Sequence, residues 1–362
     1  MTGVSIPPLD RQAQEEARRR WDNLTKPVGS LGRLEELGIR IAGITGRPSA
    51  RIRRKVIFTV AADHGVVAEG VSAYPQEVTL QMVANFLRGG AGINVLARHV
   101  GAEVLVVDAG IAGSPDSADG LIHAKVRPGT GNMARGPAMD RAEAEQAIRN
   151  GIRIFDDAHR ERAIDLVGLG DMGIGNTTAS TALTAALTGA KVSEVTGRGT
   201  GLVDQQLRRK VQVIEKVLAL HRPDPSDPLD CLAKVGGLEI ACLAGIALAG
   251  AQARVPVVLD GFITSAAALV ACRIAPGLSD HLIASHRSVE PGHRILLESM
   301  GLVPLFDLQM RLGEGTGAAL AFSLVEASLK LLSEMATFSE ALVSGPAGSD
   351  PLGSDPKGSD PR

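Results

Sequence analysis

The chain has 362 residues, enough for one large α/β unit with a smaller unit beside it and a sizeable buried core. Its formal net charge is −2 and only 2% of its residues are aromatic, so it offers neither a basic face nor a stacking platform, and we expect no nucleic-acid partner. The cysteines, Cys231, Cys242 and Cys272, have no C-x-x-C spacing and are expected as core residues rather than as metal ligands, disulfides or nucleophiles.

The first part of the chain is charged and helical in pattern. Glu and Arg residues follow Asp10 before any apolar block, so we expect no ordinary signal peptide and a cytoplasmic location. Residues 10–46 are predicted to form two helices joined around TKPVGSLGRLE, where Pro27 and Gly29 break the first one. Residues 1–50 would then supply the N-terminal helices of a small domain.

Residues 51–304 carry the pattern of an α/β domain. Five short runs rich in Val, Ile and Leu are separated by stretches long enough for crossovers: KVIFTVAAD, EVLVVDAG, AIDLVGLGD, VPVVLDG and HLIASH. This alternation predicts a Rossmann-like, mostly parallel sheet with helices on both faces. Ligands bind outside the carboxyl ends of such strands, so the polar residues there should outline one pocket. They are Asp63 and His64, Asp108, Asp171, Asp260, and Ser285 with His286.

The last part of the chain changes character twice. Residues 305–344 hold a glycine-rich loop and a helix predicted from about Ala318 to Phe338, which would complete the small domain. Residues 345–362 are a Gly-Ser-Asp-Pro repeat that is expected to be disordered. The most apolar helix, IACLAGIALAGA after Glu239, is too short to cross a bilayer and is predicted to be buried, so we expect no membrane partner.

The first glycine-rich motif, GLGDMGIGNTTAS at 168–180, lies between a predicted strand and a predicted helix. Backbone N–H groups at the start of that helix, with the hydroxyls of Thr177 and Thr178, suit an anion such as phosphate. The motif matches neither the dinucleotide fingerprint nor the Walker loop. From the motif alone, a tight turn without a ligand remains the alternative.

The second motif, RLGEGTGAALA at 311–321, places Glu314 among three glycines directly before a long apolar helix. Glycines let a ligand approach the backbone closely, and the helix start leaves free N–H donors facing the same space. Glu314 is therefore a candidate catalytic carboxylate. The alternative is that it only caps the helix or compensates its dipole.

Three further candidates are weighed from their local patterns. His64 is expected to order a loop or line the pocket, because no paired His or Cys spacing supports a metal site. Ser285 and Ser288 could bind a substrate or cap the helix that begins near Glu290. Lys210, on an amphipathic helix, is by pattern alone a residue of a solvated face.

These segments together resemble the nicotinate-nucleotide:dimethylbenzimidazole phosphoribosyltransferase family. The resemblance covers nearly everything except the tail. It implies a Rossmann-like α/β domain, a small helical domain from both ends of the chain, a homodimer, and a reaction that needs no metal or organic cofactor. The motifs that carry it are TKPVGSLGRLE, ADHGVVAEGVSAYPQEVT, GDMGIGNTT, LAKVGG, VVLDGF, SHRSVEPG and RLGEGTGAALA.

The resemblance also implies roles for single residues. Glu314, flanked by Gly313 and Gly315, matches the catalytic base. Many relatives carry Glu where this chain has Asp171, which is one methylene shorter, so we keep Asp171 as a helper whose reach is open. The phosphate of nicotinate mononucleotide would lie against Gly173, Gly175, Asn176, Thr177, Lys210 and Ser288, and the acceptor base against Tyr74, Met82 and Leu312.

The implied reaction transfers the phosphoribosyl group of nicotinate mononucleotide to 5,6-dimethylbenzimidazole, giving α-ribazole 5′-phosphate and nicotinate with inversion, in assembly of the cobalamin nucleotide loop. The attacking benzimidazole must lose a proton, which one carboxylate can accept. Positioned base catalysis is worth about 10²–10⁴-fold. Two alternatives stay open: a sensor that binds without forming product, and an enzyme that uses the same donor with another acceptor, such as adenine, another benzimidazole or a phenol.

Overall fold

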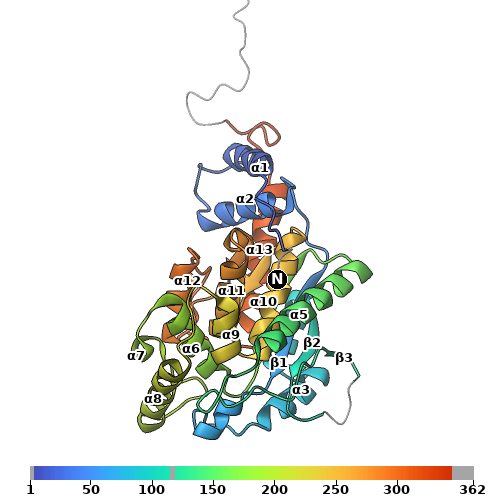
Figure 1. Ribbon diagram of the computed structural model, residues 1–362. Helices are drawn as coiled ribbons and strands as arrows, with labels where there is room; N and C mark the ends of the chain where they lie inside the picture. The colour runs from blue at the N-terminus through green and yellow to red at the C-terminus, as the bar shows by residue number, and fades with distance from the viewer. Residues whose placement is uncertain (1–3, 115–118, 345–362) are drawn as a thin grey trace, which may run out of the picture.

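The computed structural model describes residues 4–114 and 119–344 (Figure 1). The predicted disordered tail, residues 345–362, lies outside the described residues. Within them the chain forms a six-stranded sheet in the order β3-β2-β1-β4-β5-β6, and every neighbouring pair of strands is parallel. The strands are β1 (Lys55–Ala62), β2 (Glu103–Gly110), β3 (Leu121–His123), β4 (Leu166–Met172), β5 (Val257–Leu259) and β6 (Leu282–Ala284).

The five predicted strands are confirmed, and β3 was missed. Its three residues, at the edge of the sheet, are too few to show any periodicity, and their pairing with Val106–Asp108 of β2 identifies them as a strand. The order of strands reverses between β1 and β4, because the chain continues to one side after β1 and to the other after β4. In open parallel sheets such a reversal leaves a crevice at the carboxyl ends, where ligands bind.

Helices cover both faces of the sheet, as predicted. β1 is buried along its whole length. Its consecutive residues Ile57 and Phe58 point to opposite faces of the sheet and belong to two separate apolar cores. One core contains α5 (Arg141–Glu161), α10 (Leu238–Gln252) and α11 (Phe262–Ile274). The other contains α3 (Val78–Leu87), α4 (Gly92–Val100) and α13 (Thr316–Glu334).

The two N-terminal helices, α1 (Arg11–Asn23) and α2 (Arg33–Thr45), form as predicted and lie beyond one end of the sheet in Figure 1. They pack on the far end of α13 around a small cluster of their own that includes Trp21 and Leu332. Our residue boundaries for the small domain remain a prediction, since α13 contributes to this cluster and to the sheet core alike.

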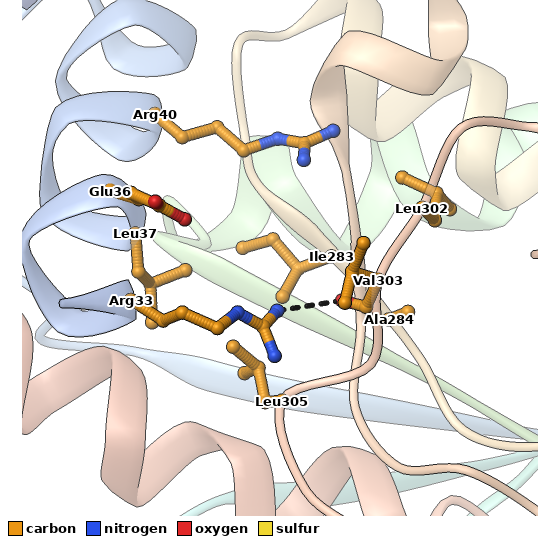
Figure 2. Close-up of a pocket in the computed structure, with 9 residues that line it drawn as sticks. All are labelled: Arg33, Glu36, Leu37, Arg40, Ile283, Ala284, Leu302, Val303 and Leu305. Atoms are coloured by element: carbon orange, nitrogen blue, oxygen red, sulfur yellow. Dashed lines mark hydrogen bonds between the residues drawn. The ribbon is translucent and has the colours of Figure 1, made fainter.

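The helix α2 is fastened to the β6 edge of the sheet by its arginines (Figure 2). Arg33 donates to the carbonyl oxygens of Val303, at 2.8 Å, and Pro304, while Arg40 donates to that of Ser279 at 2.6 Å. Leu37 lies between them and joins the same core as Ile283 of β6. Burial lowers the pKa of Arg40 from its ordinary value. The guanidinium groups thus satisfy carbonyls that a loop would otherwise leave to water.

The helix α13 differs from its prediction at both ends. It begins two residues before Ala318 and ends four residues before Phe338, because Thr337 pairs with Leu24 in an antiparallel bridge. By length and composition α13 could cross a membrane, but it packs on β4, β5, α2 and α4 and serves as a core helix. The predicted buried helix, α10, is confirmed.

The remaining helices lie mostly on the carboxyl-end side of the sheet and carry the loops of the site. Of the cysteines, Cys231 and Cys242 are buried and Cys272 is half-buried, and all three are free thiols. These helices are α6 (Asn176–Thr188), α7 (Val192–Val195), α8 (Asp204–His221), α9 (Pro228–Val235) and α12 (Pro291–Ser299), with short 3₁₀ turns at Gly65–Glu69 and Leu278–His281.

Candidate active site

A cavity of about 530 Å³ opens at the carboxyl ends of β4 and its neighbours, where the strand order reverses. Three of the residues expected at the site lie behind its wall: Gly175 and Gly315 precede α6 and α13, and Lys210 contacts Thr177. The others line the cavity itself: Tyr74, Met82, Asp171, Gly173, Asn176, Thr177, Ser288, Leu312, Gly313 and Glu314.

The row of polar strand ends divides into residues that line the cavity and residues that brace loops. Asp171 and His286 line it. Asp63 accepts from the Ala112 N–H at 2.8 Å, and Asp108 accepts from the Ile111 N–H at 2.8 Å. The expectation of one continuous polar row is therefore wrong for Asp63 and Asp108, whose buried carboxylates are used by backbone donors.

Glu314 is held in place by three contacts with distant parts of the chain. Its Oε2 accepts from the Ile93 N–H at 3.1 Å, in the first turn of α4. Its own N–H donates to the Asp171 carbonyl at 3.2 Å, and its carbonyl accepts from the Thr59 hydroxyl at 2.9 Å. The sequence left open that Glu314 only compensates the dipole of the helix that follows it. Its carboxylate instead lies at the start of α4 and not of α13.

The backbone and the burial of Glu314 are both unusual. Its φ of +64° lies in the left-handed region, which costs a residue with a side chain about 1–2 kcal/mol. Its side chain is 5% exposed, and burial raises the pKa of Glu314 while the Ile93 N–H opposes that rise. Strained conformations of this kind persist where the surrounding structure over-determines them, often at functional sites.

The start of α13 is closed to ligands, contrary to our expectation of free donors. Asp260, which follows β5 and is 1% exposed, accepts from the Gly315 N–H at 3.0 Å and from the Gly317 N–H at 2.6 Å. A Cβ on Gly317 would lie 2.0 Å from Nδ1 of His286, so only glycine fits there. Burial raises the pKa of Asp260 to about 7, against the opposing effect of its backbone donors.

The start of α6 faces the cavity and has a buried cation behind it. Gly175, with φ +96°, precedes Asn176 and provides no side-chain cap. Lys210 of α8 is fully buried, with Nζ 2.7 Å from the Thr177 hydroxyl and 3.4 Å from the Gly197 carbonyl. Its local pattern had suggested a solvated face, and that interpretation is wrong. Burial lowers the pKa of Lys210 to about 8, and Glu290 acts to raise it.

Asp171 connects the two glycine-rich motifs. Its Oδ2 accepts from the Asn176 side-chain amide at 3.0 Å, and its carbonyl accepts from the Glu314 N–H. Burial, and then the nearby carboxylates of Asp260, Glu239 and Glu314, raise the pKa of Asp171 well above its ordinary value. Burial and like charges therefore favour the neutral form of this carboxyl more than they do for an exposed Asp.

The serine and histidine candidates separate in a similar way. Ser285 donates to the Asp260 carbonyl at 2.9 Å and holds a loop, whereas Ser288 lines the cavity. His64 is 1% exposed and its Nε2 lies 2.7 Å from Oε1 of Glu239. A Cβ on Gly173 would lie 3.4 Å from Nε2 of His64 and 3.5 Å from Oε1 of Glu239, so this pair packs directly against the glycine-rich loop.

Several cavity residues were not singled out from the sequence, although they lie inside the quoted motifs. Glu290 accepts from the Gly199 N–H at 2.9 Å, and Arg311 donates to the Gly199 carbonyl at 3.0 Å. Thr200 lies on the same loop. Their positions within SHRSVEPG, RLGEG and TGRGTGL were the available signal. Across residues 4–114 and 119–344, no group of three or more His, Cys, Asp or Glu side chains is arranged to hold a metal ion.

One cavity thus combines an open helix start, a buried lysine beside it, and a buried glutamate with a raised pKa. Open helix starts bind phosphate, and a carboxylate whose pKa is raised toward neutrality suits proton transfer. On a doubly wound parallel sheet, this arrangement is typical of enzymes that act on phosphorylated small molecules.

Comparison with known proteins identifies the family. A family model described as "Phosphoribosyltransferase" matches residues 6–343. Nicotinate-nucleotide–dimethylbenzimidazole phosphoribosyltransferases of Desulforudis audaxviator and Chloroflexus aggregans are 57% and 58% identical to this chain over 339 residues, which is 94% of this chain and 96% of each relative. The chain belongs to the nicotinate-nucleotide–dimethylbenzimidazole phosphoribosyltransferase family, and the resemblance described above is confirmed.

The structural comparison agrees. The crystal structure of the Thermus thermophilus member superposes on this chain with a TM-score of 0.88 at 51% sequence identity, and the match covers 93% of this chain and all of that one. The strand pairing and the match to a solved structure both confirm the predicted α/β class with a parallel sheet. The chain is a phosphoribosyltransferase.

Proposed function

We propose that this enzyme transfers the phosphoribosyl group of nicotinate mononucleotide to 5,6-dimethylbenzimidazole, producing α-ribazole 5′-phosphate and nicotinate for the nucleotide loop of cobalamin. The observation that carries the proposal is the sharing of one cavity by the open start of α6, with Lys210 behind it, and by the buried carboxylate of Glu314. The relatives named above bear this activity in their names.

The phosphate end of the donor fits the start of α6. Among the described residues, the N–H groups of Gly175 and Thr177 have no hydrogen-bond partner, whereas those of Asn176 and Thr178 donate to backbone carbonyls. The ammonium of Lys210 contacts the Thr177 hydroxyl. Gly173 and Gly175 let the phosphate approach the backbone, and Ser288 adds a hydroxyl from the opposite wall. Lys210 is already fully buried and held by Thr177, so the anion would gain a desolvated partner without ordering a flexible side chain.

The proton is removed at the other end of the cavity. One nitrogen of the benzimidazole attacks the anomeric carbon, and the bond from that carbon to nicotinate breaks with its electron pair going to the pyridine nitrogen. Glu314 takes the proton from the second benzimidazole nitrogen, so the product is neutral at the new ring. Since Ile93 occupies Oε2, Oε1 of Glu314 is the oxygen we assign as base. The attack and departure occur on opposite faces of the ribose, which gives inversion.

The acceptor pocket is the apolar part of the same cavity. Tyr74, Met82 and Leu312 supply a ring, a thioether and a branched side chain of the kind that holds a flat aromatic base. Tyr74 and Leu312 are 53% and 60% exposed, so the bound base would cover them. We assign Asp171 the role of a neutral hydrogen-bond donor or acceptor between the two substrates. Its side chain is one methylene shorter than Glu and is held by the Asn176 amide at 3.0 Å.

We also propose a homodimer and a cytoplasmic location. Large apolar side chains are exposed near the mouth of the cavity, on the loop before and within RLGEG, and they include Leu308 and Leu312. Exposed apolar groups that adjoin a site are common at subunit interfaces. Light scattering of the purified chain and fractionation of the producing cell would test these two expectations.

The decisive experiment is an assay of the purified enzyme with both substrates. Incubation with nicotinate mononucleotide and 5,6-dimethylbenzimidazole should yield free nicotinate and α-ribazole 5′-phosphate in equal amounts, which chromatography with mass spectrometry detects. Binding of the nucleotide with no product from any azole or phenol would favour the sensor. Product from adenine or a phenol, but none from the benzimidazole, would keep the donor and change the acceptor.

A further inference from the structure

A second and larger cavity, of about 780 Å³, lies at the amino ends of the strands. Three segments enclose it: the linker from α2 to β1, the turn from α5 to β4, and the turn from α10 to β5. Each segment leads into one of three neighbouring strands, so the cavity sits at the edge of the sheet opposite the active site. The eight residues of β1 separate the two by roughly 25 Å.

The lining of this cavity is strongly basic although the whole chain carries a net charge of −2. Its ionisable lining contains one acid, Asp165, and a single histidine, His159. The six arginines are Arg47, Arg51, Arg53, Arg54, Arg162 and Arg254.

The few acids nearby do not neutralise these cations. Asp165 uses its Oδ2 to accept from the backbone N–H groups of Arg53, at 2.8 Å, and Arg54, at 3.0 Å. Glu103 is shared, since Arg54 and Arg162 approach its two oxygens at 2.9 Å and 3.5 Å. Both carboxylates are therefore already engaged at the floor of the cavity.

Three of the arginines have no partner in the protein. Within residues 4–114 and 119–344, the guanidinium groups of Arg47, Arg51 and Arg53 make no hydrogen bond or ion pair, and Arg254 donates only to the carbonyls of Ile44 and Pro8. These three exposed arginines all line the cavity, and Arg51 and Arg53 also line a neighbouring one with Glu326 and Glu334, with which they form no ion pair within the described residues. A cavity of this size can hold a small molecule. Guanidinium groups bind phosphate oxygens in pairs, and several of them together match an anion with several charges.

We propose that this arginine-lined cavity binds a small anion carrying three or more phosphate charges, a triphosphate or a nucleoside triphosphate, independently of the substrate site. Its enclosure on three sides favours a small ligand over a long polyanion, and the low aromatic content offers no platform for a nucleic acid. The strand β4 begins at Leu166, directly after Asp165 of this cavity, and contains Asp171 of the active site, so a ligand here would lie at the opposite end of the same strand.

The test is calorimetric titration of the full-length protein with inorganic triphosphate at low salt. The triple variant Arg47→Gln, Arg51→Gln, Arg53→Gln should lose about tenfold or more in affinity, since each Arg–phosphate pair is a charge-assisted contact. A matched control removes three exposed arginines that pair within their own helices, as Arg18→Gln, Arg149→Gln, Arg294→Gln, and should bind as the unmodified protein does. Equal weakening in both triple variants would show a general charge effect and overturn the proposal.

A second background separates this cavity from the active site. The Lys210→Met variant removes the buried cation beside α6, and triphosphate binding should persist in it with the same affinity. If binding disappears with Lys210→Met, or if no binding is found at millimolar triphosphate, the proposal is wrong. Titration with ATP distinguishes the sources of the ligand: equal affinities for ATP and inorganic triphosphate support recognition of the phosphates alone, and tighter ATP binding supports a nucleoside triphosphate.

Discussion

The starts of α6 and α13 look alike in sequence and behave differently in the fold. Both follow a left-handed glycine, and neither has a side-chain cap from the residue before it. At α13 the donors of Gly315 and Gly317 are taken by Asp260, whereas at α6 a buried lysine stands beside the first turn. The comparison teaches that two similar glycine-rich helix starts can differ in whether a carboxylate takes their donors, and this difference is why we propose the phosphate site at α6 and not at α13.

Removing the proton acceptor should have the largest effect on turnover. Glu314→Gln keeps an oxygen for the Ile93 N–H but cannot take a proton, so kcat should fall about 10²–10⁴-fold while nucleotide binding is retained. Steady-state kinetics and calorimetry measure the two quantities. Glu298→Gln, on the exposed side of α12, is the control and should be fully active. A kcat within a few-fold of normal would remove Glu314 from the role of base.

Removing the cation beside α6 should have the second-largest effect, on KM and not on kcat. Lys210→Met fills a similar volume without charge, and KM for nicotinate mononucleotide should rise about tenfold to a hundredfold because a charge-assisted contact is lost. kcat should change much less. Lys216→Met, on an exposed position of the same helix, is the matched control. If both variants raise KM equally, α6 is not the phosphate site and the contrast with α13 disappears.

Opening the start of α13 should cost stability. In Asp260→Asn one of the two acceptor oxygens becomes an NH₂ group that faces a backbone donor, and the free energy of unfolding should fall by about 1–3 kcal/mol. Urea denaturation measures this loss. Asp227 caps α9 through Oδ1, and its Oδ2 accepts from the exposed Arg141 at 2.6 Å. Asp227→Asn should therefore cost at most about 1 kcal/mol, because Asn and Asp cap helices about equally well and an exposed ion pair contributes little. Similar losses in the two variants would mean that Asp260 is an ordinary cap.

The pH dependence of kcat and kcat/KM should show the smallest effects. It should separate the role of Glu314, before α13, from that of Lys210, beside α6. Glu314 must be ionised to accept a proton, and its pKa is raised by burial, so kcat should increase with pH through a midpoint above the ordinary range for Glu. Lys210 must be charged to hold phosphate, and its pKa is lowered to about 8, so kcat/KM should decline as the pH rises past about 8. In Lys210→Met the alkaline decline should be absent. A decline that persists in this variant would assign it to another group.

The sequence predicted what depends on local pattern. The five strands were recognised because runs such as VIFTVAA are rich in β-branched and apolar residues and contain no charged one, and the two N-terminal helices because Pro27 and Gly29 separate them. The strand β3 was not predicted because three residues are too few to show the alternating pattern of a strand. The family resemblance led to the right cavity residues, although the catalytic and binding roles assigned to them stay predictions.

What the sequence could not predict depends on residues far apart in the chain. Lys210 has the same amphipathic surroundings whether its side chain is solvated or buried, and only the packing of α8 against the 197–200 loop decides between them. The donors of α13 are satisfied by Asp260, which lies more than fifty residues earlier. Ile93, the partner of Glu314, is separated from it by 221 residues. No local pattern contains such pairs.

The long reach of α13 has a consequence for how the protein is made. Thr59 holds the backbone carbonyl of Glu314 and Ile93 holds its carboxylate, but the loop that carries Glu314 is anchored by a helix that ends at Glu334. The ribosome adds about 5–20 residues per second, so β1 waits on the order of tens of seconds for this partner. During that interval the buried face of β1 must be shielded by other contacts. The active site is thus assembled last, and a chain released before α13 is made would lack the helix that anchors the Glu314 loop.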